Sequence, residues 1–289
     1  MLGLRTGPGR VVMGPMRRPQ DTTQFDAVDL APDVAYLVRF LETAKQVPGF
    51  RQAKDEMLAA MRLRPGMCVL EGGCGLGADA VELAARVAPV GRVVAVDLSR
   101  AMIEEARRRA GEEVGITWQV ADLLDLPFAD GAFDACRVET VLQHVHDPAR
   151  ALAEVARVTR PGGRVVCLEF DLGTAMVDSP RRATTRTILT SLADAFAQGW
   201  VGRQLPRLLA EVGLVEISIS PRVMLGGYPF WRLLLDRHLA WLQESGVLGR
   251  DEIEGWWAEL AEAHASGVFT AGASAFLVAA TRPASAARR

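Results

Sequence analysis

The sequence predicts an α/β fold, a doubly wound and mostly parallel sheet of seven strands with helices on both faces. Three observations support this prediction. Short apolar segments alternate with helix-forming stretches along most of the chain, a pattern typical of a parallel sheet. A glycine-rich turn from Gly73 to Gly77 follows the first of these segments, and the acids Glu71 and Asp97 end two of them. In an open α/β sheet, the carboxyl ends of the strands form the ligand-binding edge.

The predicted strands are short runs rich in valine and other apolar residues, as buried parallel strands are. Between them, helix-forming stretches cover the segments 79–84, 99–110, 148–158 and 205–212. Ser99 can cap the second of these helices, because its hydroxyl accepts a hydrogen bond from a free amide of the first turn. The predicted strands are 67–71, 93–96, 116–120, 133–138, 165–170, 214–220 and 275–280.

Further helical segments fall outside this alternation. Residues 25–62 predict at least two helices, broken at Pro48-Gly49, and we expect them to form a lid. The segments 172–200 and 222–270 predict helical insertions that cap the strand ends. We expect both chain ends to be disordered, and the first twenty residues are rich in Gly, Pro and Arg. The expected units are a tail over 1–20, one domain over 21–282 and a tail over 283–289.

The composition describes an ordinary globular protein, with 49% hydrophobic and 24% charged residues. A net charge of -2 gives no electrostatic reason to expect nucleic acid or an anionic membrane as a partner. The four cysteines form no C-x-x-C pair, which favours a reducing cytoplasm and disfavours a metal site. We therefore expect a cytoplasmic monomer or homodimer without a bound metal.

The glycine spacing indicates which kind of nucleotide the turn accepts. A dinucleotide fingerprint needs G-x-G-x-x-G, whereas here Gly73, Gly75 and Gly77 alternate with other residues after Glu71. This E-x-G-x-G-x-G run resembles the first motif of the class I S-adenosylmethionine (SAM)-dependent methyltransferases. A tight strand-to-helix turn without a ligand is the alternative reading. The resemblance implies the Rossmann-like methyltransferase fold, with SAM as cofactor and S-adenosylhomocysteine as product.

The resemblance implies roles for the acids at the strand ends. Asp97 would accept hydrogen bonds from both ribose hydroxyls, and Asp122 would take the adenine amino group. Leu98 and Met102 would lie on the two faces of the adenine ring. A charge that favours the following helix is the alternative for Asp97, and a solvated loop acid is the alternative for Asp122. The remaining predicted cofactor-binding residues are Glu71, Gly72, Gly73, Cys74, Gly75, Leu123 and Arg137.

Two later stretches narrow the resemblance to enzymes that act on small molecules. The segment from Leu126 to Asp134 resembles the L-P-F-x-D-x-x-F-D motif, and Arg157 to Gly163 resembles the R-V-L-x-P-G-G turn. Both are expected to be structural turns before strands. The resemblance covers residues from about 50 to 220 and is greatest to the menaquinone and ubiquinone C-methyltransferases.

For the acceptor side the sequence offers several candidates, each of which also has a structural role as an alternative. His144 is placed to act as a general base or to pack and hydrogen-bond, with Gln143 beside it. Glu169 and Asp171 either orient an acceptor or hold a loop. Arg203 either binds an anionic group or lies on the surface. Trp231 belongs to an apolar helical stripe, which is either core or the wall of an acceptor pocket.

The predicted activity is transfer of the methyl group of SAM to a C, O or N nucleophile of a small organic molecule. The Ala-, Arg- and Gly-rich composition suggests a GC-rich bacterium and secondary metabolism. An alternative is a SAM-binding protein of the same fold that binds or rearranges another molecule without methyl transfer. A macromolecular target is disfavoured, because Arg137-Val138-Glu139-Thr140 stands where amide and base-amine methyltransferases carry an N-P-P-Y-type loop.

Overall fold

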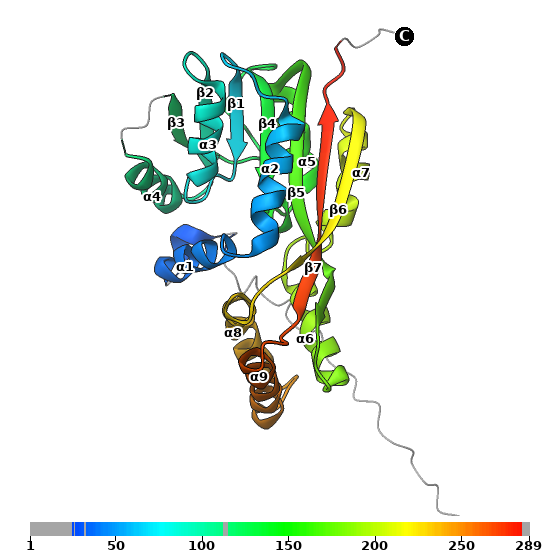
Figure 1. Ribbon diagram of the computed structural model, residues 1–289. Coiled ribbons are helices and arrows are strands. Elements are labelled where there is room, and N and C mark those ends of the chain that lie inside the picture. Colours follow the sequence, from blue (N-terminus) through cyan, green and yellow to red (C-terminus); the bar gives the residue numbers. More distant parts are fainter. Residues whose placement is uncertain (1–24, 26, 32, 112–114, 285–289) are drawn as a thin grey trace, which may run out of the picture.

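The computed structural model describes residues 25, 27–31, 33–111 and 115–284. Of the predicted tails over 1–20 and 283–289, residues 1–20 and 285–289 lie outside this part of the chain. Residues 283 and 284 follow the last strand without helix or strand structure. In the described part, seven strands form one sheet (Figure 1). The strands are β1 Cys68–Gly72, β2 Arg92–Asp97, β3 Ile116–Val120, β4 Phe133–Glu139, β5 Thr159–Val177, β6 Val215–Leu225 and β7 Ala271–Thr281.

The sheet has the order β3-β2-β1-β4-β5-β7-β6. Its first five strands pair in parallel, and β7 runs antiparallel to both β5 and β6. The order reverses between β1 and β4, the neighbours that share the centre of the sheet. In an open sheet, a crevice for ligands forms at the carboxyl ends of strands next to such a reversal.

Local signals in the sequence explain where the main helices begin. Pro48 occupies the first turn of α2, where its missing amide hydrogen costs no hydrogen bond. The Ser99 hydroxyl accepts a hydrogen bond of 3.1 Å from the Met102 amide and so caps α4, as predicted. The helices are α1 Val34–Ala44, α2 Pro48–Met61, α3 Ala78–Val87, α4 Arg100–Ala110, α5 Pro148–Val158, α6 Arg182–Ala195, α7 Val201–Glu211, α8 Tyr228–Glu244 and α9 Arg250–Ala265. Two short 3-10 turns are η1 Val28–Leu30 and η2 Leu142–His144.

Alternate residues of the strands pack into two separate cores. Val69 belongs to the core that contains α2 and α3, whereas Leu70 belongs to the core that contains α5 and α7. Met57 and Leu152 are fully buried representatives of the helices on the two faces. Burying such side chains supplies about 1.5–3 kcal/mol each, which is what fixes the two helical layers on the sheet.

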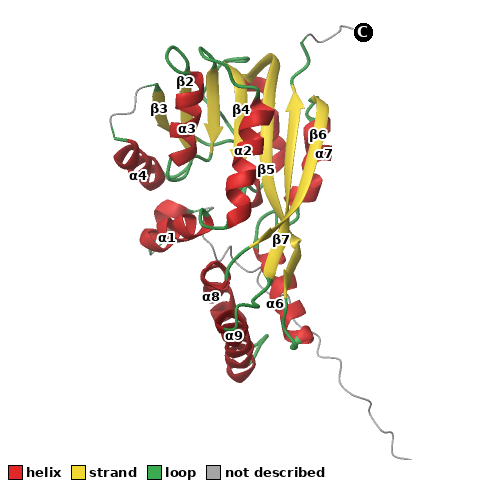
Figure 2. Cartoon of the chain, viewed as in Figure 1, coloured by secondary structure: helices red, strands yellow, loops and turns green. Residues whose placement is uncertain are grey.

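The cap region differs from the sequence prediction. Residues 172–177 were expected to be helical, but β5 continues to Val177 and pairs with the first residues of β7. Likewise β6 continues to Leu225, within the predicted helical insertion. These extensions continue the sheet beyond its parallel strands, and α6 follows the first while α8 and α9 follow the second (Figure 2). The cap has an apolar core of its own around the fully buried Trp256.

The N-terminal segment bridges the main sheet and the cap. The Asp29 carboxylate accepts hydrogen bonds from the Ser99 hydroxyl at 2.5 Å and the Arg100 amide at 2.9 Å. The Tyr36 hydroxyl of α1 donates to the Leu233 carbonyl of α8 at 2.5 Å. Asp29 is thereby attached to the start of α4, and α1 is attached to the cap. Among the described helices, none has the length and apolar character needed to cross a bilayer.

Candidate active site

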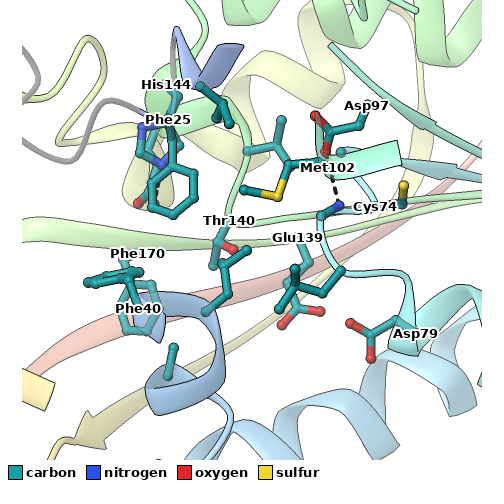
Figure 3. Close-up of a pocket in the computed structure, with 18 of the residues that line it drawn as sticks. Phe25, Phe40, Cys74, Asp79, Asp97, Met102, Glu139, Thr140, His144 and Phe170 are labelled. Carbon is teal, nitrogen blue, oxygen red and sulfur yellow. Dashed lines mark hydrogen bonds between the residues drawn. The ribbon is translucent and has the colours of Figure 1, made fainter. Parts of the chain in front are cut away.

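A cavity of about 620 Å³ opens at the carboxyl ends of β1, β2 and β4 and continues to the residues of the cap. Its volume is typical of small-molecule sites. Figure 3 shows the acids Asp79 and Asp97 on one side of the cavity and Phe25, Phe40 and Phe170 on the other. The two sides of the cavity therefore differ in chemistry.

The glycine turn is held tightly against β2. The amides of Gly73 and Cys74 both donate to the Val96 carbonyl, at 2.8 and 2.9 Å. Gly73 has a φ of +71°, and a Cβ atom there would lie 2.3 Å from Cγ2 of Val141. Only glycine fits both the backbone angle and the space. Gly73, Cys74 and Gly75 all line the cavity.

Asp97 ends β2 inside the cavity. One carboxylate oxygen accepts from the Gly75 amide and the other from the Ser99 amide, both at 2.9 Å. Burial raises the pKa of Asp97, and these two hydrogen bonds act against that rise. A carboxylate oxygen has more than one acceptor site, so both oxygens keep the capacity to accept from a ligand. Leu98 and Met102 line the cavity beside Asp97.

The loop after β3 contributes Asp122 and Leu123 to the cavity wall. The Asp122 carboxylate accepts a hydrogen bond of 2.9 Å from the Leu124 amide, which fixes the turn of this loop. Gly72 was predicted to contact the cofactor, but it does not line the cavity. A Cβ atom at Gly72 would lie 2.9 Å from the Leu123 side chain, which covers it.

Glu71 lines the cavity from the end of β1, and its partner Arg137 lies behind it. The Arg137 guanidinium is almost fully buried and forms ion pairs with Glu71 and Glu139. Burial raises the pKa of Glu71 to about 7, against the opposing effect of Arg137. Arg137 was predicted to contact the cofactor. Instead it is absent from the cavity wall, because Glu71 and Glu139 hold its side chain.

A second part of this charged cluster was not predicted from the sequence. Lys54 of α2 donates to both carboxylate oxygens of Asp79 at 2.7 Å. Burial alone would raise the pKa of Asp79, but Arg137 and Lys54 outweigh it and lower the pKa. Lys54, Asp79, Glu139 and Lys45 all line the cavity. No local pattern marks them, because α2 and α3 meet only in the fold.

The loop after β4 presents Gln143 and His144 to the cavity. The side-chain amide nitrogen of Gln143, Nε2, lies 3.1 Å from Nε2 of His144. The imidazole of His144 lies between two aromatic rings, with centroid distances of 5.4 Å to both Phe25 and Phe196. The predicted base therefore reaches the cavity within an aromatic environment.

Glu169 does not line the cavity, although it was a substrate candidate. Its side chain is fully buried on β5. Oε1 accepts hydrogen bonds from the Val141 amide at 2.9 Å and the Leu142 amide at 2.7 Å. Of its two predicted roles, the contacts match the holding of a loop.

Asp171 and Arg203 were also substrate candidates, and they pair with each other instead. Both guanidinium nitrogens Nε and Nη2 of Arg203 bond to the Asp171 carboxylate, the second at 2.9 Å. The guanidinium also stacks 4.5 Å from the centroid of Trp200. Neither charged residue lines the cavity, because the pair ties the start of α7 to β5.

Trp231 lines the cavity from α8 and is buried, so the apolar stripe of α8 serves both core and wall. We use the term cap side for the ten lining residues from β5 onward. All ten are uncharged. They are Phe170, Leu172, Phe196, Ala197, Met224, Gly226, Phe230, Trp231, Leu234 and Ala273. Phe25, Phe40 and Phe50 of the lid adjoin this side, and the sequence analysis did not single them out.

Within the described residues, no group of three or more His, Cys, Asp or Glu side chains is arranged to hold a metal ion.

The glycines of the turn differ in the space that an added Cβ atom would have. Residue 75 would meet nothing closer than 3.5 Å, whereas residue 77 would meet Trp118 at 2.5 Å. The main chain at Gly75 is therefore open to a ligand, while Gly77 is required for packing.

Residues 70–167 match the family model described as a methyltransferase domain. An uncharacterised 37.1 kDa protein in transposon TN4556 of Streptomyces fradiae is 40% identical over 185 residues, covering 64% of this chain and 54% of that protein. A demethylmenaquinone methyltransferase of Symbiobacterium thermophilum is 40% identical over 117 residues, covering 39% of this chain and 47% of that enzyme. The matched segments thus span about half the length of these relatives.

The fold also resembles that of a solved methyltransferase. Phosphoethanolamine N-methyltransferase 2 of Haemonchus contortus, in complex with S-adenosyl-L-methionine, superimposes with a TM-score of 0.53 at 18% identity. The match covers 80% of this chain and 52% of that one. Residues 70–167 therefore match a methyltransferase domain, and the chain shares its fold with the Haemonchus contortus enzyme.

Proposed function

We propose that this protein transfers the methyl group of SAM to a nucleophile of an uncharged, apolar small molecule. The observation that carries the proposal is the division of one cavity into a charged side at the strand ends and an uncharged cap side. A charged adenosyl donor, with sulfonium, ammonium and carboxylate groups, fits the first side, and an apolar acceptor fits the second. The cavity joins them, so that the reacting groups can meet.

The adenosyl part of the donor would bind at the tips of β2 and β3. There Asp97 would accept the ribose hydroxyls, with Leu98 and Met102 on the adenine ring and Asp122 near its amino group. These residues all line the cavity, and the Gly75 amide donates to Asp97 among them. The buried and unpartnered Oε2 of Glu71 supports a cationic ligand group nearby.

The amino-acid part of the donor would bind at the charged cluster. Glu71 and Glu139 are placed to accept from its ammonium group, and Lys54 and Lys45 are placed to neutralise its carboxylate. Lys54 is paired with Asp79, so binding would require it to share or exchange that partner. An ion pair in a partly buried site holds such a ligand in one orientation.

When bound, SAM supplies an electrophilic methyl group on its sulfonium. The residues of the cavity then contribute alignment and the exclusion of water, which together account for a large part of catalysis in such transfers. Phe25 and Val28 of the N-terminal segment line the cavity and would shield it from solvent. Where the acceptor must lose a proton, His144 is the residue placed to take it.

The acceptor class follows from the cap side. Every described residue that contributes a carboxylate or an ammonium group to the cavity lies at or before Glu139, and the cap side contributes none. Burying a charged acceptor there would be costly. Aromatic walls accommodate a planar ring system, and one relative is named a demethylmenaquinone methyltransferase. A carbon or oxygen nucleophile on such a ring, in a cytoplasmic pathway of secondary metabolism, is the form of the proposal that we favour.

The test is incubation with methyl-labelled SAM and a panel of acceptors. We expect label in uncharged naphthols and quinols, and none in phosphoethanolamine. Binding of S-adenosylhomocysteine without any labelled product would instead support the alternative of a SAM-binding protein that does not transfer methyl. Label only in charged acceptors would contradict the acceptor class.

A pair of variants tests the assignment of the cap side. Phe230 lines the cavity, whereas Phe269 packs in the cap without lining it. Phe230→Leu should raise the acceptor KM several-fold with little change in donor affinity. Phe269→Leu should change neither. Equal effects of the two substitutions on KM would contradict the assignment.

A further inference from the structure

The loop that follows β4 needs support from outside itself. Thr140 has a φ of +53°, a left-handed angle that a branched side chain rarely adopts. Directly after it, η2 carries Gln143 and His144 into the cavity. A strained backbone persists only where its surroundings hold it. The position of these two side chains therefore depends on the contacts that fix the loop.

Strand β5 provides those contacts through consecutive residues. The Leu168 carbonyl accepts from the Thr140 amide at 2.8 Å. Oε1 of Glu169 then accepts from the amides of Val141 and Leu142, at 2.9 and 2.7 Å. These are the first amides of a short 3-10 turn, which have no partner within the turn itself. A fully buried carboxyl group supplies what the turn lacks.

The other end of the loop is held by the segment between α6 and α7. The Gln198 amide donates to the Gln143 carbonyl at 3.0 Å, and the Gln198 side chain donates to the His146 carbonyl at 3.2 Å. The loop is thus fixed from β5 at its start and from the cap connection at its end. Of these supports, the Glu169 side chain is fully buried.

We infer that Glu169 is the positioning residue of the acceptor-facing loop. Its carboxyl group fixes the amides of Val141 and Leu142 and thereby sets Gln143 and His144 against the acceptor. It does not touch the acceptor itself. The inference rests on the proposed function for the identity of the ligand, but the loop geometry stands independently of it.

Most other side chains at position 169 would not accept hydrogen bonds from both amides. An apolar side chain would leave the amides of Val141 and the buried Leu142 without this partner, which is unfavourable. Aspartate would keep the carboxylate but withdraw it by one methylene from both amides. Glutamine keeps the shape and the acceptor oxygen. The series Glu169→Ala, Glu169→Asp and Glu169→Gln therefore separates the hydrogen bonds from the charge.

Asp171→Asn is the matched control. Asp171 is a second fully buried carboxyl group on β5, two residues further on, and its partner is Arg203 rather than the loop. A substitution there perturbs a buried acid of the same strand without removing a contact to residues 140–144. Any effect of general destabilisation should appear in both variants.

The first measurement is amide hydrogen exchange at Val141 and Leu142, which requires no turnover. Glu169→Ala should speed exchange at both amides by about tenfold or more, and Glu169→Asp by a smaller factor. Glu169→Gln and Asp171→Asn should leave it within about twofold of the wild type. If Glu169→Ala fails to fold, Glu169→Asp carries the same comparison. Unchanged exchange, or equal changes in Glu169→Asp and Asp171→Asn, would overturn the inference.

The second measurement separates acceptor from donor. Glu169→Asp should lower kcat/KM for the acceptor by about tenfold, while the affinity for S-adenosylhomocysteine stays within about twofold. Glu169→Gln should restore most of kcat/KM. Altered exchange with wild-type acceptor kinetics would overturn the positioning role. If the wild-type protein methylates no acceptor, the proposed function fails, whereas the exchange data still decide whether Glu169 holds the loop.

Discussion

Replacing Gly73 by alanine should damage the donor site far more than the same change at Gly213. Both glycines have left-handed backbone angles, with φ values of +71° and +82°. They differ in what surrounds them. A Cβ atom at residue 73 would lie 2.3 and 3.0 Å from the two methyl groups of Val141, whereas at residue 213 nothing lies within 4 Å. The comparison isolates the steric contact from the backbone angle.

The expected loss of stability has two contributions, one from the backbone angle and one from the steric contact. The left-handed angle costs an alanine about 1–2 kcal/mol at either position. The contact with Val141 adds about 1–3 kcal/mol at residue 73 alone, as overpacking of a filled site does. For a domain of this size, each 1 kcal/mol lowers Tm by about 2–4 °C. Because the Gly73 and Cys74 amides anchor the turn on β2, displacing them should also weaken S-adenosylhomocysteine binding by about tenfold or more.

The assays are thermal unfolding and calorimetric titration with S-adenosylhomocysteine. Gly73→Ala should show a lower Tm and weaker binding than Gly213→Ala, whose binding should match the wild type. Adding Val141→Ala to Gly73→Ala should recover part of both losses, because it removes the two methyl groups in question. Equal Tm values and equal affinities for the two single variants would refute the reasoning.

Three further predictions concern residues behind or beside the cavity. Burial raises the pKa of Glu169 to about 8, so its contribution to stability is present at low pH and is lost as pH rises through about 8. Glu169→Gln should therefore gain roughly 2–4 kcal/mol in unfolding free energy over the wild type between pH 5 and 9, and a constant difference in urea titrations would contradict this. Arg203→Ala should lower the unfolding free energy by about 2 kcal/mol, since it strands the buried Asp171 carboxylate, without altering S-adenosylhomocysteine affinity in calorimetry. His144→Ala should slow transfer to an acceptor that must be deprotonated by about 100-fold or more, and undiminished turnover at every pH would exclude it as the base.

The sheet and the tips of its first three strands were predictable because their signals are local. The turn after Glu71 and the acid at Asp97 follow buried strands directly, and parallel strands bring their ends to one edge. The cavity lining includes both residues.

The charged cluster was less predictable because it depends on register and on tertiary contacts. Glu71 and Arg137 are partners on neighbouring parallel strands. Their opposite charges would have predicted the ion pair if the register of β1 and β4 had been known. Without that register, the position of Arg137 at a strand end predicts a contact with the ligand. Lys54 carries no such signal, because it reaches Asp79 only when α2 packs beside α3.

The helices of the cap were predicted from the sequence, but the strand extensions that lead into it were not. The run from Leu172 to Val177 mixes glycine, threonine and small apolar residues, so its pattern does not distinguish strand from helix. Pairing with β7 decides it. The Asp171–Arg203 pair escaped prediction for a related reason: a charged residue at a strand end has the same appearance whether it meets a ligand or a distant helix.

The most direct test of the whole account is calorimetric titration of the purified protein with S-adenosylhomocysteine, with Asp97→Asn and Asp134→Asn in parallel. Asp97 lines the cavity, whereas Asp134 accepts from the Cys68 amide at the opposite ends of β1 and β4. We predict saturable binding to one site, at least tenfold weaker in Asp97→Asn and unchanged in Asp134→Asn. Absence of binding by the wild-type protein, or equal affinity in Asp97→Asn, would contradict the assignment of this cavity to an adenosyl donor.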